Sequence, residues 1–123
     1  MEMNFHQIDV SKRGEVFCAR LKKRNMTEAD LHQFGEEVSE LIAEHGCRKL
    51  ALALGKERLD CLQSMFIGKL NMIRRLLLDE KGHMRLCEIA PINFDVLKVC
   101  KITELIETQP DLDAAVKSLE EAD

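Results

Sequence analysis

The sequence contains no apolar run approaching the ~20 residues that a helix needs to cross a bilayer. Its opening residues, MEMNFHQIDV, carry an acidic side chain and no apolar stretch after a basic cluster, so they do not predict a secretory signal. The 123 residues are 46% hydrophobic and 33% charged, which is typical of a folded, water-soluble chain. We therefore expect one globular domain, residues 1–123, in the cytoplasm.

Disulfide, metal and cofactor motifs are also missing. The cysteines are odd in number and form no C-x-x-C pair, which argues against a disulfide framework, a zinc ribbon and a thioredoxin-type motif; they are Cys18, Cys47, Cys61, Cys87 and Cys100. The histidines show no H-x-x-x-H spacing, and neither G-x-G-x-x-G nor a P-loop occurs. We therefore expect free thiols, no metal, no cofactor and no catalytic group.

Positive charge is too sparse for a nucleic-acid-binding protein. The formal net charge is −4, and most basic residues alternate with acidic ones, whereas phosphate neutralisation needs concentrated Lys and Arg. The one basic run, RLKKR from Arg20 to Arg24, is interpreted as the solvated end of a strand. We expect neither a nucleic acid nor a membrane as partner.

The first half of the chain predicts a hairpin, a helix and a central strand. Over residues 5–21, apolar and polar side chains first alternate and then become mostly apolar, with an interruption at Arg13-Gly14. This pattern indicates two antiparallel strands. Thr27 is a natural N-cap for the following helix, Gly46 suits its left-handed end, and its carboxylates are expected on the polar face; they include Glu36, Glu37 and Glu40. KLALAL, residues 49–54, is typical of a strand buried on both faces.

The second half alternates helices and strands. A helix with one apolar face is expected to end at Gly82, HMRLCEI is a strand, and Pro91 opens another helix. TELIET indicates a short edge strand before a last helix. The apolar stripes of these three helices are Phe66, Leu70, Ile73 and Leu77; Ile92, Val96 and Val99; and Leu112, Ala115, Val116 and Leu119.

This order of elements predicts an α/β fold. A hairpin followed by alternating helices and strands requires a mixed, mainly parallel sheet covered by about four helices, with the hairpin as its antiparallel edge. Such an order defines the fold class without defining the function.

Three segments, in this order and spacing, resemble a known family. They are RKLALAL followed by SMFIGKLNMIRRLLLDEKGHMRLCEIAP, then FDVLKVCKITELIET, then DLDAAVKSL. Together they resemble the STAS domain of bacterial anti-sigma factor antagonists. The resemblance implies a non-enzymatic signalling module that binds a regulatory protein, such as an anti-sigma factor kinase, and it leaves open whether the domain forms a dimer.

The same resemblance implies where the partner binds. In the antagonists a partner kinase phosphorylates the second serine of an Asp-Ser-Ser-Gly-Leu-Gly stretch. Aligning Ile67-Gly68 with the final Leu-Gly places Gln63 at the aspartate, Ser64 at the first serine and Met65 at the phosphoacceptor. The partner-binding residues expected on this basis are Asp60, Cys61, Gln63, Ser64, Met65 and Lys69.

Ser64 has two interpretations. As the first residue of a helix it could simply cap or begin that helix. Alternatively it is a candidate phosphosite, because free amides and the macrodipole favour an anion at a helix N-terminus, and the added charge could release a partner. Next to it, Phe66 is expected in the core and Met65 on the contact surface.

Two other functions compete with the binding module. One is a redox sensor that uses the Cys61 thiol, which would require a lowered pKa at that thiol. The other is a STAS relative that binds a nucleotide or another small ligand at the start of the same helix.

Overall fold

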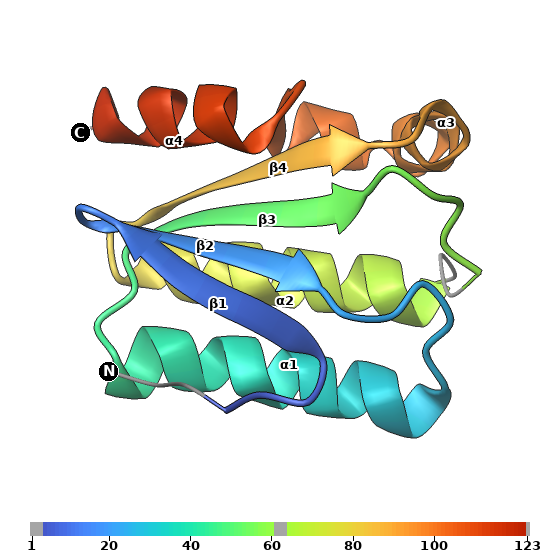
Figure 1. The fold of residues 1–123 in the computed structure, drawn as a ribbon, viewed down its shortest axis with the longest axis horizontal. Coiled ribbons are helices and arrows are strands. Elements are labelled where there is room, and N and C mark those ends of the chain that lie inside the picture. The colour runs from blue at the N-terminus through green and yellow to red at the C-terminus, as the bar shows by residue number, and fades with distance from the viewer. Residues whose placement is uncertain (1–3, 61–63, 123) are drawn as a thin grey trace.

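The computed structural model describes residues 4–60 and 64–122, and these residues form a five-stranded sheet and four α-helices (Figure 1). The strands are β1 (Ile8–Arg13), β2 (Val16–Leu21), β3 (Lys49–Gly55), β4 (His83–Ile89) and β5 (Glu107–Gln109). The helices are α1 (Glu28–Glu44), α2 (Ser64–Asp79), α3 (Pro91–Val99) and α4 (Leu112–Glu120), and a short 3₁₀ helix, η1, covers Ile102–Glu104.

The strands lie in the order β1-β2-β3-β4-β5. β1 and β2 pair antiparallel, and every later pair in this order is parallel. The predicted α/β class with an antiparallel edge hairpin is therefore confirmed. The hairpin turn lies one residue later than predicted, at Gly14 and Glu15, and Gly14 supplies the positive φ of 61° that the turn uses.

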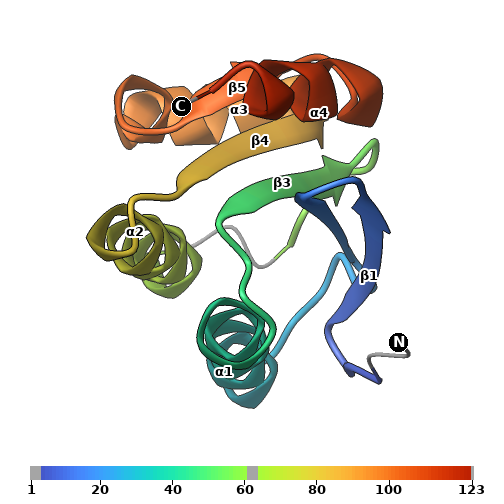
Figure 2. The ribbon, with the colours of Figure 1, turned by 90° about the vertical axis from the view of Figure 1, so that its left-hand side faces the viewer.

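Helices cover both faces of the sheet (Figure 2). α1 and α2 lie together on one face, and α4 lies across β2, β3 and β4 on the other. β3 is the strand between these layers, and its residues Leu50 to Leu54 are all buried, as its uniformly apolar sequence predicts. The stripes of α2 and α4 are confirmed as core residues, although Leu112 is only half-buried.

The ends of α1 follow from local chemistry. Asp30 N donates to Thr27 Oγ1 at 3.1 Å, and Thr27 N donates to Asp30 Oδ2 at 3.1 Å, which completes a capping box. Gly46, with φ of 70°, follows the last turn. Both predicted ends of this helix are therefore confirmed.

Gly82 has a different role from the one predicted. The left-handed residue after α2 is Lys81, with φ of 60°, and Gly82 N donates to Leu77 O at 2.6 Å. A Cβ at Gly82 would lie 2.5 Å from Arg48 O. The glycine is therefore needed where two backbone segments approach each other.

The predicted stripe of α3 is wrong. Ile92 is 47% exposed and Val99 is 81% exposed, whereas Asn93 and Leu97 are buried. α3 lies beyond the ends of β3 and β4 instead of across the sheet (Figure 1), so the side that it buries faces a loop as well as the core. TELIET is also only partly a strand, because η1 occupies its beginning and β5 starts at Glu107.

Glu37 is a further correction. Its side chain was expected on the polar face of α1, but the residue is only 8% exposed. Glu37 Oε2 accepts from His6 N at 2.7 Å and Oε1 accepts from Gln7 N at 2.9 Å. The carboxylate therefore attaches the segment before β1 to α1.

Candidate functional site

The predicted site lies at the carboxyl end of the parallel strands, where the loops after β2 and β3 meet α3 and the start of α2 (Figure 1). Contacts between residues of the described part of the chain join the two loops. Asp60 N donates to Arg24 O at 2.8 Å, and Arg24 Nη1 lies 2.8 Å from Glu57 Oε2. Ligand sites in open α/β sheets characteristically lie at this end of the strands.

A buried amide on α3 holds the loop after β3. Asn93 is 1% exposed. Its Oδ1 accepts from Leu59 N at 3.0 Å, and its Nδ2 donates to Glu57 O at 2.9 Å. Because the oxygen and the nitrogen of its side-chain amide are both paired with backbone groups, Asn93 fixes the position of the segment that leads into the predicted site.

Sequence reasoning missed Asn93. The apolar residues around it in PINFDVL attract attention to Ile92 and Val96. A lone asparagine in so short a helix was the available signal, but the sequence does not say which backbone groups it would pair with.

The predicted partner-binding residues do not all lie on one surface. Asp60 is exposed, and its Oδ1 lies 4.0 Å from Arg58 Nε. Ser64 is exposed as the first residue of α2, whereas Met65 is half-buried and packs against the core. Cys61 and Gln63 lie outside the described residues. Gln63 directly precedes Ser64, so the N-cap position of α2 lies outside the described residues as well.

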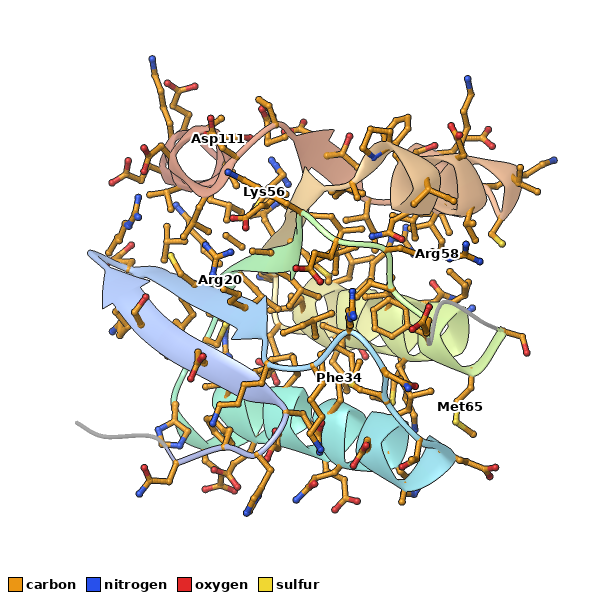
Figure 3. The ribbon with its side chains drawn as sticks, turned by 45° about the vertical axis from the view of Figure 1, so that its right-hand side comes forward. Arg20, Phe34, Lys56, Arg58, Met65 and Asp111 are labelled. Carbon is orange, nitrogen blue, oxygen red and sulfur yellow. The ribbon has the colours of Figure 1, made fainter. Side chains whose placement is uncertain are left out.

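Lys69 lies on the α1 side of α2. Lys69 Nζ is 3.3 Å from His32 Nδ1 of α1. A Cβ added at Gly35, also on α1, would lie 3.0 Å from Lys69 Cδ. Met65 precedes Lys69 by four residues and so shares this flank, and Figure 3 shows it at the α1 side of the start of α2. A groove of about 550 Å³ between the two helices follows the same flank.

Ser64 lies on the other flank of α2. It borders a cavity of about 440 Å³ toward α3 and η1. The lining is mostly apolar and consists of Ser64, Ile67, Gly68, Asn71, Cys100, Ile102 and Leu105. The structure therefore separates Ser64 from Met65 and Lys69, although the three are close in sequence. Phe66, between the two flanks, is fully buried as predicted.

The buried thiols are unsuited to redox chemistry. Burial raises the pKa of the Cys47 thiol to about 12 and that of the Cys87 thiol to about 12. Burial also raises the pKa of Cys18. A raised pKa keeps a thiol protonated and poorly nucleophilic at neutral pH.

Within 4–60 and 64–122, no group of three or more His, Cys, Asp or Glu side chains could hold a metal ion. Among the helices of these ranges, none combines the length and the hydropathy of a membrane-spanning segment.

No family model matches the chain, and no curated protein matches it by sequence. Solved structures do match. A STAS domain protein from Planctomyces limnophilus has a TM-score of 0.79 and 20% identity, over 92% of this chain and 97% of that one. An anti-sigma factor antagonist from Mycobacterium paratuberculosis has a TM-score of 0.78 and 14% identity, over 93% of each chain.

A third similar structure is the Bacillus cell fate determinant SpoIIAA in its phosphorylated form, with a TM-score of 0.65 and 16% identity, over 90% of this chain and 98% of that one. The sheet order, the helix placement and these likenesses define the chain as an α/β protein with the STAS fold. The anti-sigma factor antagonist from Mycobacterium paratuberculosis shares this fold.

Proposed function

We propose that this protein is a non-enzymatic interaction module that captures a regulatory protein through residues 55–63 and the start of α2. The observation that carries the proposal is the exposed beginning of α2, together with residues 57–60, which hydrogen bonds to Asn93 and Arg24 fix in place. A preformed loop loses little conformational entropy when a partner binds.

The likeness to solved structures supports the class of partner that we propose. The similar structures are anti-sigma factor antagonists, and one of them is a phosphorylated form. A cytoplasmic anti-sigma factor kinase, or a related bacterial signalling protein, is accordingly the proposed partner of this chain.

Met65 takes the place of the phosphoacceptor serine in the proposed alignment. A methionine at a contact surface adapts to irregular partner surfaces through its flexible, polarisable side chain. Ser64 retains one hydroxyl at the helix start, where a phosphate would be favoured by the free amides of the first turn. Capture would then be controlled at Ser64, or it would be constitutive.

The test is affinity capture from the lysate of the source organism, with bound proteins identified by mass spectrometry. Met65→Glu should reduce capture of a histidine-kinase-like ATPase, because it places a charge in a half-buried apolar contact. Ser64→Glu tests the preceding residue of the sequence, which is exposed, so this variant should remain folded. Each variant is accepted only if its thermal unfolding matches that of the wild type.

Leu78→Glu is the matched control, because it also replaces an apolar residue of α2 by Glu but lies 52% exposed at the opposite end of the helix. Capture should be retained in this variant. If Met65→Glu and Ser64→Glu capture as much partner as Leu78→Glu does, residues 64 and 65 are not part of the binding surface and the proposal fails.

A further inference from the structure

Positive charge is concentrated at one end of this acidic protein. The segments 20–24 and 56–60 hold six basic and two acidic side chains, whereas the whole chain has 18 Lys and Arg and 22 Asp and Glu. Both segments lie at the carboxyl end of the parallel strands, since they include the end of β2 or follow β3. Figure 3 shows Lys56 and Arg58 beyond the end of β3.

The two segments enclose a cavity of about 410 Å³, which we call the basic cleft. Its floor is apolar, because Leu21, Leu54 and Leu59 are all buried. The other lining residues are Lys22, Lys23, Arg24, Gly55, Lys56 and Glu57. A volume of this size holds a few side chains of a docked segment.

The charges of the cleft are unequally neutralised. Lys22 Nζ donates to Phe5 O at 2.5 Å and lies 3.7 Å from Asp9 Oδ1, and Lys23 Nζ lies 3.6 Å from Asp30 Oδ2. The closer pair, at 2.8 Å, is between Arg24 and Glu57. Among the described residues Lys56 has no ion-pair or hydrogen-bond partner, so its ammonium group is available to a ligand.

We propose that the basic cleft binds an acidic segment of the protein partner, with an apolar side chain against the leucine floor and flanking carboxylates at Lys22, Lys23 and Lys56. The proposal rests on the proposed function, because the cleft adjoins the segment that leads to Ser64. Charge complementarity would accelerate encounter and orient the partner before Met65 makes contact.

A nucleic acid fits this cleft less well than an acidic peptide does. Binding of single strands depends on aromatic side chains on which bases stack. The described lining residues include no aromatic side chain, and their apolar groups are leucines.

The experiment is an NMR titration of the ¹⁵N-labelled protein with a nine-residue peptide that has a central leucine between Glu and Asp residues. The amides of 21–24 and 55–59 should shift, and the Kd should rise about tenfold between 50 and 500 mM NaCl as the charges are screened. The Gln and Asn analogue of the peptide should bind at least about tenfold more weakly.

Lys56→Glu should weaken binding of the acidic peptide by about tenfold at 50 mM NaCl, with a smaller effect at high salt. Lys117→Glu makes the same charge reversal at an exposed position of α4, which covers the face of the sheet opposite α1 and α2, and it should leave the Kd unchanged. The proposal is overturned if the neutral analogue binds equally well or if both variants have the same effect. It is also overturned if pyrophosphate binds at the cleft and the peptide does not, since the cleft is then a small-anion site.

This test can fail separately from the test of the proposed function. If the acidic peptide does not bind but Met65→Glu still reduces partner capture, the interaction module remains and the basic cleft has no part in it. If the peptide binds as expected but neither Met65→Glu nor Ser64→Glu alters capture, the cleft binds acidic segments and the assigned docking surface is wrong.

Discussion

α2 and α3 both begin at the carboxyl end of the sheet, yet only α2 buries the apolar stripe that its sequence predicts. α2 buries an apolar stripe that includes Phe66 and Leu70. α3 buries Asn93 and Leu97 and exposes Ile92 and Val99. The same apolar periodicity thus marks the core side of one helix and the solvent side of the other.

The difference arises from what each helix packs against. α2 packs on the sheet and on α1, where the partner groups are side chains, so apolar burial is favourable. α3 also packs against the loop after β3, whose backbone groups must be paired when they are buried. Asn93 supplies that pairing for Leu59 N and Glu57 O.

The largest expected difference is between alanine substitutions in the two apolar stripes, one residue in each. Phe66 is fully buried, and its ring lies 5.7 Å from that of Phe34. Phe66→Ala should lower the free energy of unfolding by about 3–5 kcal/mol, whereas Val99→Ala should change it by less than about 0.5 kcal/mol. Urea denaturation measures both values. Similar losses for the two variants would show that α3 has no solvent-facing stripe.

An intermediate effect is expected at Asn93. Asn93→Ala leaves Leu59 N and Glu57 O without their partners, so the free energy of unfolding should fall by about 1–3 kcal/mol. Amide exchange at Leu59 should also accelerate, because that hydrogen bond is removed. Asp95→Ala, at an exposed position of the same helix, is the matched control. Unchanged exchange at Leu59 would contradict the role given to Asn93.

The smallest effect is expected where the two helices are alike. Lys81 and Lys101 follow α2 and α3 with φ of 60° and 63°. Replacing either with Gly should raise the free energy of unfolding by about 0.5–1 kcal/mol, and with it the thermal midpoint, because Gly adopts this backbone conformation without a steric penalty. Lys98→Gly, inside α3, should instead destabilise by about 1 kcal/mol. A loss of stability at Lys81→Gly or Lys101→Gly would contradict the shared geometry.

Much of the fold could be predicted from sequence because it depends on local signals. The capping box at Thr27, the positive φ at Gly46 and the uniformly apolar β3 each follow from short stretches. The stripe of α2 also has the expected orientation, because a long amphipathic helix next to a sheet has only one way to bury its apolar side.

The rest depends on contacts between distant segments. The orientation of α3 depends on the two hydrogen bonds of Asn93, one to Leu59 across 34 positions of the chain and one to Glu57 across 36. The buried carboxylate of Glu37 serves backbone groups about 30 positions away. The basic cleft likewise requires two segments that no local pattern joins, so the sequence of RLKKR by itself predicts only a solvated strand end.

The most direct test of the central claim is amide hydrogen exchange of the protein alone and in complex with its captured partner. The account predicts slower exchange at the carboxyl end of the sheet, in residues 56–60 and 64–69, and unchanged exchange at the opposite end, in residues 45–48 and 80–83. Protection confined to the opposite end, with none around Ser64, would contradict it.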